Sequence, residues 1–339
     1  MKDIEAAIKT TVNIEKMFNK SVLVTGVTGL VGSFLVKMFM TLNDEKGANI
    51  RIYALARNGQ RAKELFGDRG DINYVIQDVN DPISVDGYVD FIIHAAGDGY
   101  PEAFRVRPVE TMTPAVIGTI NTLNLACEKK VESYIYISSG EVYGNPKSDG
   151  VPRREDEFYS AGAMSSRSCY PVAKQAAETL CVSYCSEYDV PAKVARLSHV
   201  YGANTALGDN RASTQFIKSA ASGEDIVLHS EGAQVRSYTY IADAAAGILN
   251  ILLNGENGEA YNVSNKNSVV SIAEFAKKLA EVAGVQCRFE IPNETQVKEK
   301  TPIQYAVLDS GKLEGLGFKG AFDIEEGLKV TIDNIRGNK

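Results

Sequence analysis

Short apolar runs alternate along the chain, up to about residue 197, with longer segments of helical apolar spacing. The run Val22–Thr25, for example, leads into positions 33–40, where apolar residues recur three and four apart as on one helix face. Apolar strands separated by helices predict a parallel sheet that is covered on both faces. The further strands predicted in this way are Ile50–Leu55, Asn73–Gln77, Val89–His94, Tyr134–Ser138 and Ala192–Leu197, and the longest helices are Val109–Lys129 and Tyr170–Tyr188.

The pattern loosens after residue 197, where shorter segments are separated by glycine and asparagine turns. A smaller C-terminal substrate-binding lobe is therefore expected over 198–339, with some of its segments returning to the sheet. Before the sheet, residues 1–19 are expected to form an amphipathic helix, with Ile4, Ile8 and Val12 on one face. The candidates after residue 197 are the strands Ile226–Leu228, Ala260–Val263 and Cys287–Glu290 and the helix Ser271–Ala283.

The stretch Ser21–Gly32, SVLVTGVTGLVG, combines a strand, a glycine turn and the start of a helix. Gly26 allows the tight turn, Gly29 allows close approach of a pyrophosphate, and Gly32 allows the helix to pack on the strand. Free N–H groups and the helix dipole would hold the anion. This pattern predicts an α/β Rossmann-type fold with an NAD(P)-binding domain over 20–197. The predicted phosphate-binding residues are Gly26, Thr28, Gly29, Leu30, Val31 and Gly32.

Composition narrows the class of protein. The 339 residues are 44% hydrophobic, enough for one large α/β unit or two lobes, and the net charge of −7 argues against a nucleic-acid partner. No apolar run reaches the roughly 18 residues of a membrane span, and residues 1–18 lack a signal-peptide core. The five scattered cysteines favour reduced thiols in a cytoplasmic protein, and no metal site is predicted.

Tyr170 and Lys174 carry the sharpest chemical signal. Residues four apart share a helix face, and an ammonium close to a phenol favours the phenolate, which lowers the phenol pKa from near 10. Tyr170 is therefore a candidate acid or base, although a Tyr and a Lys at this spacing more often mark an exposed helix face. Ser138 and Ser139 close the preceding strand, where open α/β folds place their chemistry.

These motifs together resemble the extended short-chain dehydrogenase/reductase family, in its nucleotide-sugar epimerase/dehydratase branch, over about residues 20–335. Within that branch, AETLC at 177–181, DNR at 209–211 and AQVR at 233–236 look most like the UDP-glucuronate decarboxylases. The motifs that carry the wider resemblance are the three glycines, HAAG at 94–97, ISSGEVYG at 137–144, RSCYPVAK at 167–174, RLSHVYG at 196–202 and RSYTYIAD at 236–243.

The resemblance implies roles for individual residues. Tyr170 would take the proton of the sugar 4-hydroxyl while a hydride passes to the nicotinamide, Ser139 would hydrogen-bond the same oxygen, and Lys174 would bind the nicotinamide ribose. A 4-keto sugar results, which loses carbon dioxide if it carries a C5 carboxylate, or water if it carries a 6-hydroxyl. Further contacts to NAD or NADP are implied for Asp78, Val79, Ala95, Ala96 and Gly97, and contacts to the substrate for His199, Arg211 and Arg236.

Glu141 distinguishes the possible reactions. The family's dehydratases carry Thr-Asp-Glu at the end of this strand and its decarboxylases Thr-Ser-Glu, whereas Ser139, Gly140 and Glu141 stand here. Glu141 therefore favours decarboxylation and Gly140 argues against dehydration. A solvated loop carboxylate is the structural alternative for Glu141, and surface salt bridges are the alternative for the arginines.

The chain departs from the family at several positions. The acid that holds the NAD ribose is absent after the second strand, where Arg57 stands, so that NADP fits at least as well as NAD. Arg57 lying over the adenine is the alternative. His199 replaces the family's usual Asn, and Pro114 stands where an Asn is common. Asp98 would lie badly beside a substrate carboxylate.

The sequence thus predicts an enzyme that oxidises the sugar C4 hydroxyl of a nucleotide sugar with a retained NAD(P), with decarboxylation as the leading outcome. Dehydration, 4-epimerisation and 4-keto reduction are the enzymatic alternatives, and a non-catalytic NAD(P)-sensing protein is the alternative of another class. The resemblance also implies a homodimer formed through the two long helices.

Overall fold

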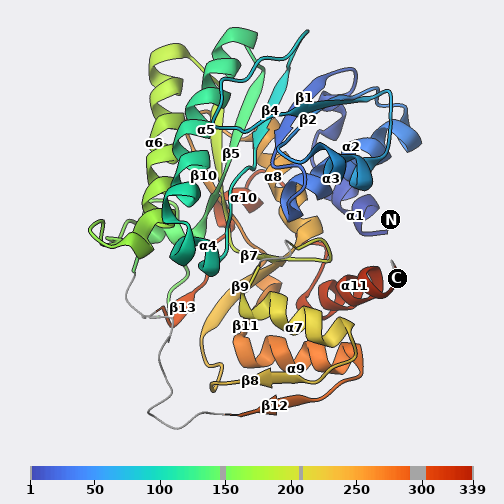
Figure 1. The fold of residues 1–339 in the computed structure, drawn as a ribbon, viewed down its shortest axis with the longest axis vertical. Helices are drawn as coiled ribbons and strands as arrows, with labels where there is room; N and C mark the ends of the chain where they lie inside the picture. Colours follow the sequence, from blue (N-terminus) through green and yellow to red (C-terminus); the bar gives the residue numbers. More distant parts are fainter. Residues whose placement is uncertain (1, 146–149, 206–208, 291–302, 338–339) are drawn as a thin grey trace.

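The computed structural model describes residues 2–145, 150–205, 209–290 and 303–337. Its centre is a seven-stranded sheet in which every neighbouring pair of strands is parallel, in the order β10-β6-β5-β4-β1-β2-β3 (Figure 1). The predicted doubly wound parallel sheet is therefore confirmed. Its strands are β1 (Ser21–Thr25), β2 (Arg51–Ala56), β3 (Ile72–Ile76), β4 (Phe91–His94), β5 (Ser133–Ser139), β6 (Ala192–Leu197) and β10 (Ala260–Val263).

Each end of the predicted strands lies within two residues of the strand end in the structure. The fourth strand differs most. It begins at Phe91, two residues after the predicted start, so Val89 and Asp90 precede it. The Asp90 carboxylate accepts hydrogen bonds from the Ser21 backbone N–H and hydroxyl, both at 2.7 Å, which fixes the residues that enter β4. The strand predicted to end at Glu290 ends at Phe289.

Helices cover both faces of the sheet. The alternation of side chains along β1 separates the faces, since Val22 and Val24 belong to one apolar cluster and Leu23 to the other. The first face carries α1 (Lys2–Thr10), α2 (Leu30–Lys46), α3 (Gly59–Phe66) and α8 (Ile241–Asn254), and the second carries α5 (Pro108–Lys129) and α6 (Cys169–Tyr188).

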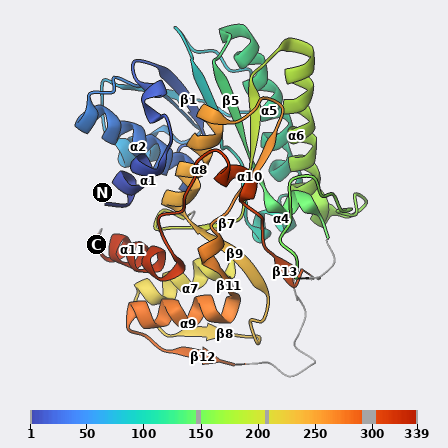
Figure 2. The ribbon, with the colours of Figure 1, turned by 180° about the vertical axis from the view of Figure 1, so that it is seen from behind.

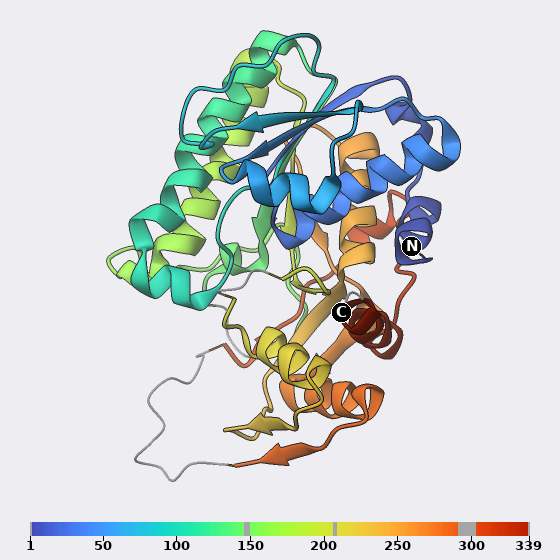
Figure 3. The ribbon, with the colours of Figure 1, turned by 45° about the vertical axis from the view of Figure 1, so that its right-hand side comes forward.

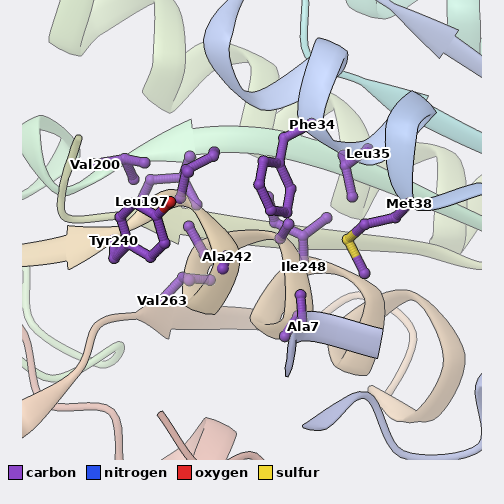
Figure 4. Close-up of a cluster of buried hydrophobic side chains, with 14 of the residues drawn as sticks. Ala7, Phe34, Leu35, Met38, Leu197, Val200, Tyr240, Ala242, Ile248 and Val263 are labelled. Atoms are coloured by element: carbon purple, nitrogen blue, oxygen red, sulfur yellow. The ribbon is translucent and has the colours of Figure 1, made fainter. Parts of the chain in front are cut away.

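The core of the first face brings distant parts of the chain together. Phe34, Leu35 and Met38 of α2 meet Ile248 of α8 and Ala7 of α1, all of them buried (Figure 4). Seen from behind, α8 lies against the sheet with α10 (Gly311–Glu314) beside it (Figure 2). At roughly 25 cal/mol per Å² of apolar surface, such burial supplies most of the stabilisation of the domain.

The N-terminal segment corrects one prediction. The helix ends at Thr10, and a 3₁₀ turn, η1 (Ile14–Met17), follows, so Val12 lies outside the helix rather than on its face. The chain leaves the helix because the Val12 N–H donates to the Asn250 side chain at 2.9 Å, and Asn13 adopts a left-handed conformation with φ of 59°.

A smaller C-terminal lobe lies below the carboxyl ends of the strands (Figures 1 and 3). In it β9 is the central strand, pairing with β7, β11 and β13, while β8 pairs with β12. The chain between β9 and β11 returns to the main domain, where it forms α8 and β10. The lobe contains β7 (His199–Tyr201), β8 (Ile226–Leu228), β9 (Val235–Tyr240), β11 (Val269–Ser271), β12 (Cys287–Phe289), β13 (Tyr305–Ala306), α7 (Ala212–Ala221), α9 (Ile272–Ala283) and α11 (Ile324–Gly337).

Candidate active site

A cavity of about 880 Å³ lies where the carboxyl ends of the central strands face the C-terminal lobe. The strand order reverses between β1 and β4 at this edge, which is where open α/β sheets place their ligands. All residues that the sequence predicts for cofactor, chemistry and substrate line this one cavity. They are Gly26, Thr28, Gly29, Leu30, Val31, Gly32, Arg57, Asp78, Val79, Ala95, Ala96, Gly97, Ser139, Glu141, Tyr170, Lys174, His199, Arg211 and Arg236.

The glycine turn between β1 and α2 has the shape that a dinucleotide requires. Gly26 has φ of +67°, and a Cβ there would lie 2.7 Å from the Ala95 carbonyl oxygen. A Cβ on Gly32 would collide with Gly26 itself, whereas one on Gly29 would meet only the Gly26 carbonyl, at 3.3 Å. The open side of Gly29 and the unpaired N–H groups of the first turn of α2 therefore fit the pyrophosphate of a nicotinamide dinucleotide.

A buried hydrogen-bond network fixes the turn after β4. His94 Nε2 faces the Pro114 carbonyl at 3.1 Å, so it carries the proton, and Nδ1 accepts from the Thr25 hydroxyl at 2.8 Å. The Thr25 oxygen in turn accepts from the N–H groups of Ala95 and Ala96, both at 3.1 Å. Burial lowers the pKa of His94 to about 3, so the imidazole is neutral. Pro114 thus contributes a carbonyl where the family commonly has an Asn.

Tyr170 lies in the first turn of α6 with its ring against Phe104 of α4 (Pro101–Val106). The ring centroids are 4.3 Å apart and the planes 17° from parallel. The Ser139 hydroxyl, at the end of β5, lies near the phenol and acts to lower its pKa. A Cβ on Gly99 would lie 3.5 Å from the phenol oxygen, so this position needs a small residue if the oxygen is to remain reachable.

Lys174 does not lower the pKa of Tyr170 in this structure, contrary to the sequence prediction. Its ammonium donates to the Ile137 carbonyl at 2.7 Å and lies 5.7 Å from the centre of the Tyr170 ring. Burial dominates instead, and with the nearby Glu141 carboxylate it raises the pKa of Tyr170 to about 12. Burial likewise lowers the pKa of Lys174 to about 8, although the Glu178 carboxylate opposes this shift.

A buried ion pair supports these residues from behind. Glu178 lies one helical turn beyond Lys174, and its carboxylate pairs with Arg196 of β6 at 2.8 Å. Glu178 also accepts from the Ser138 hydroxyl at 2.5 Å, which ties the end of β5 to α6. The pair therefore holds together the two elements that carry Ser139 and Tyr170.

Glu141 follows Ser139 and belongs to the substrate half of the cavity. It forms an ion pair with Arg167, 3.5 Å away, and 37% of its side chain is exposed. Burial raises the pKa of this carboxyl, while the charges of Arg167 and Arg236 act in the opposite direction. Glu141 thus lines the cavity, where it pairs with Arg167 and feels the charge of Arg236, while more than a third of its side chain remains exposed.

Arg236 and Arg211 are not surface residues with salt bridges to solvent-exposed carboxylates. Arg236 is 5% exposed and donates to the backbone carbonyls of residues 235, 303 and 304, at 2.8, 2.7 and 3.3 Å. Arg211 forms a two-pronged pair with buried Asp209, with a shortest distance of 2.6 Å. Between them, burial and the two guanidinium charges lower the pKa of His199 to about 3, so this histidine is neutral.

Two neighbours of the site could not be assigned from sequence. Phe104 is one apolar residue in an ordinary amphipathic segment, and nothing in its spacing predicts contact with Tyr170. Glu178 lies four residues after Lys174, which signals a shared helix face but not a partner on β6.

Asp98, which the sequence analysis expects to lie unfavourably beside a substrate carboxylate, accepts a hydrogen bond from Arg107 at 3.2 Å.

Comparison with known proteins identifies the family. The model described as "NAD dependent epimerase/dehydratase family" matches residues 22–264, and the chain belongs to this family. Curated relatives include UDP-glucuronic acid decarboxylase 5 of Arabidopsis thaliana, 30% identical over 94% of this chain and 90% of the relative. UDP-glucuronic acid decarboxylase 1 of Xenopus tropicalis is 28% identical over 94% of this chain and 72% of the relative.

Solved structures share the fold at lower identity. UDP-glucose 4-epimerase of Thermotoga maritima, solved with UDP-glucose, has a TM-score of 0.77 at 22% identity, covering 94% of this chain and 99% of that one. DesIV of Streptomyces venezuelae, a dTDP-glucose 4,6-dehydratase solved with NAD, has a TM-score of 0.78 at 22% identity, covering 94% and 97%. In the described residues, no helix is long and apolar enough to span a membrane.

Proposed function

We propose that the protein oxidises the C4 hydroxyl of a nucleotide-activated sugar with a retained NAD or NADP, and that its reaction is the decarboxylation of UDP-glucuronate. The observation that carries this proposal is the arrangement of Tyr170, Ser139 and Lys174 in the same cavity as the glycine turn. Identity of 30% to a decarboxylase over nearly the whole chain supports the choice of substrate.

The first step is a proton transfer that the protein's own groups perform. The Tyr170 phenolate takes the proton of the 4-hydroxyl, and Ser139 hydrogen-bonds the same oxygen. When bound, the nicotinamide supplies the hydride acceptor. With a pKa of about 12, Tyr170 is a neutral phenol, so positive charge must lower that pKa before the residue acts as a base. Lys174 supplies part of that charge if its ammonium turns from the Ile137 carbonyl toward the phenol.

The second step breaks a carbon–carbon bond of the sugar. Once C4 is a ketone, the carboxylate on C5 is that of a β-keto acid. The bond to the carboxyl carbon breaks, its electron pair moves into an enolate on the C4 oxygen, carbon dioxide leaves, and C5 takes up a proton, which restores the C4 ketone. C4 would then take back the hydride and the Tyr170 phenol would return the proton to the C4 oxygen, so that the retained cofactor ends in its starting state. Glu141 can supply this proton because burial raises its pKa, and Arg236 offers positive charge to the departing carboxylate.

Two observations favour decarboxylation over dehydration. Gly140 provides no acid at the middle position of the motif, and a Cβ there would already lie 3.2 Å from the Leu308 side chain. In addition, Asp98 is paired with Arg107, which partly compensates a negative charge that would otherwise disfavour a substrate carboxylate in the cavity. Both observations concern residues that line the cavity.

A product assay tests the proposal. The enzyme, with NAD or with NADP, is incubated separately with UDP-glucuronate, UDP-glucose and dTDP-glucose, and the nucleotide products are weighed by mass spectrometry. Loss of carbon dioxide from UDP-glucuronate is expected, and Tyr170→Phe should abolish it. Tyr184→Phe is the matched control, since Tyr184 lies on the same helix and bonds Asn124 outside the cavity.

Other outcomes would replace the proposal with a specific alternative. Loss of water from a hexose indicates a dehydratase, a changed sugar without a change of mass indicates an epimerase, and a gain of two hydrogens indicates a 4-keto reductase. Cofactor binding with none of these products would indicate an NAD(P)-sensing protein. We further propose that the protein is a homodimer formed through α5 and α6.

A further inference from the structure

The end of β2 departs from what an NAD site requires. A nicotinamide dinucleotide without a 2′-phosphate is commonly held by a carboxylate at the end of this strand, which accepts from the ribose hydroxyls. Residues 54–61 read ALARNGQR and contain no acid. Arg57 is the first residue after β2, and it lines the cavity at this end together with Ala56 and Asn58.

The Arg57 guanidinium is held only weakly. Its ion pair is with Asp78, at 3.8 Å, and 70% of the Arg57 side chain is exposed. An exposed pair at this distance contributes little, so the guanidinium can take another anion at small cost. The other arginines that line the cavity are engaged more closely, as in the 2.6 Å pair of Arg211 with Asp209.

Asp78 is a second charged group at this end of the cavity, and it is poorly placed to replace the missing acid. One of its oxygens accepts from the Asn80 backbone N–H at 2.9 Å, and the other faces Arg57. A ribose diol that reached Asp78 would therefore meet one committed oxygen and one that is paired with a cation. A phosphate dianion carries twice the charge of Asp78 and competes well for the same guanidinium.

The loop that carries Arg57 is fixed at its far side. The Asn58 side chain accepts from the Arg61 backbone N–H at 2.9 Å and so caps the start of α3. The backbone next to Arg57 is thus held by a cap, whereas the guanidinium itself is exposed and only weakly paired. A planar guanidinium on a fixed backbone, at the mouth of a dinucleotide cavity, is suited to two-pronged binding of a phosphate.

We propose that the protein binds the nicotinamide dinucleotide that carries a phosphate on the 2′-oxygen of its adenosine ribose, NADP(H), in preference to NAD(H), with Arg57 pairing with that phosphate. The inference rests on the cofactor part of the proposed function and is independent of which sugar is the substrate. It separates this chain from the relatives whose solved structures hold NAD.

Two binding measurements test the inference without any sugar substrate. First, the cofactor released from freshly purified protein by denaturation is identified by mass, and NADP(H) is expected. Second, protein freed of cofactor is titrated calorimetrically with adenosine 2′,5′-bisphosphate and with AMP, and then with NADP⁺ and NAD⁺. The 2′-phosphorylated ligand of each pair should bind at least tenfold more tightly.

Variants assign the preference to one residue. Arg57→Ala should lose at least tenfold in affinity for NADP⁺ and little for NAD⁺, and Arg57→Lys should recover part of the loss. Arg61→Ala is the matched control, because this exposed arginine on α3 pairs with Glu64 rather than with a group in the cavity. Since Arg57 is exposed, the melting temperature of its variants should match that of the wild type.

Released NAD(H), or affinities for NAD⁺ and NADP⁺ within threefold of each other in the wild type, would overturn the inference. So would an Arg57→Ala variant that loses both cofactors equally. None of these results bears on the sugar reaction, which the product assay tests separately with whichever cofactor binds. Failure of the inference and failure of the proposed function are thus distinguishable.

Discussion

The ring of Tyr170 lies flat on the ring of Phe104, with 4.3 Å between centroids and 17° between planes. The Arg167 guanidinium lies 5.1 Å from the centre of the Phe104 ring. Phe104 therefore contacts both a cation, Arg167, and the candidate base, Tyr170. Because Arg167 in turn pairs with Glu141, this contact connects the two groups that the proposed reaction uses. We therefore propose that Phe104 positions Tyr170 for the proposed reaction.

Replacing Phe104 should impair chemistry more than binding. We expect Phe104→Ala to lower kcat by about tenfold or more, since small displacements of a reacting group are costly, while KM and cofactor affinity change little. Phe104→Tyr keeps the ring and should retain most activity. Steady-state kinetics provide the test, and Phe289→Ala, on β12 outside the cavity, is the control. A proportional rise of KM with unchanged kcat would contradict the positioning role.

The charge of Lys174 should limit activity at high pH. Its pKa is about 8 in this structure, below the ordinary value of 10.5, so the ammonium is present below pH 8 and lost as the pH rises through it. We expect kcat/KM to fall above about pH 8, because the phenolate loses its cationic neighbour.

Two variants distinguish this explanation from a structural one. Lys174→Arg stays charged, so the fall of kcat/KM should move to higher pH in this variant. Lys174→Met should lose on the order of a hundredfold in kcat/KM and should show no fall near pH 8. A fall near pH 8 that persists in Lys174→Met would assign it to another group.

Acid should destabilise the fold through His94. Its folded-state pKa of about 3 lies below the ordinary 6.5, so the unfolded chain binds more protons between these values, and stability is lost as the pH falls below about 6.5. One such histidine contributes a slope of up to about 1.4 kcal/mol per pH unit. His199 has the same sign.

Urea unfolding at pH 7.5, 6.5 and 5.5 measures this slope. His94→Gln should be less stable at every pH, because Thr25 and Pro114 lose their partner, yet its slope should be smaller than that of the wild type. His229→Gln, at an exposed position, is the control for the substitution itself. An unchanged slope in His94→Gln would remove this residue from the acid response.

The Glu178–Arg196 pair should be coupled. Its side chains are 12% and 14% exposed, so removing one partner leaves a largely buried charge. Either Glu178→Gln or Arg196→Met should cost about 3–5 kcal/mol of unfolding free energy. The double variant should cost less than the sum, as a double-mutant cycle of denaturant unfolding will show. Strict additivity would mean that the two groups stabilise the fold independently.

The proposed dimer can be tested on the outer face of α5 and α6. Apolar side chains remain exposed there, among them Ile117 at 41% and Val182 at 48%. The wild type should sediment as a dimer, and Ile117→Glu should shift it toward monomer, because dimerisation would bury the new charge. Tyr88→Glu is the control, as Tyr88 is 86% exposed and outside both helices. A wild type that sediments as a monomer would exclude the proposal.

Local sequence was sufficient for the sheet and the glycine turn. Apolar strands of the parallel kind are recognisable because both of their faces must be buried, as the alternating clusters of β1 illustrate. The turn is recognisable because positive φ at Gly26 and the close contact at Gly32 are demands on single residues. A Rossmann-type fold then implies the strand order, and this order places the predicted site residues at one edge of the sheet.

Only the tertiary structure decided the electrostatics of the site. The sequence shows that Tyr170 and Lys174 share a helix face, but not that Phe104 stacks on the Tyr170 ring or that the Ile137 carbonyl accepts a hydrogen bond from the ammonium. Both partners lie far away in the chain, and a pKa depends on every group and every lost water around a side chain. For the same reason the helix signal at Val12 failed, because Asn250 captures its N–H. Periodicity records local preference, whereas burial and charge are properties of the assembled molecule.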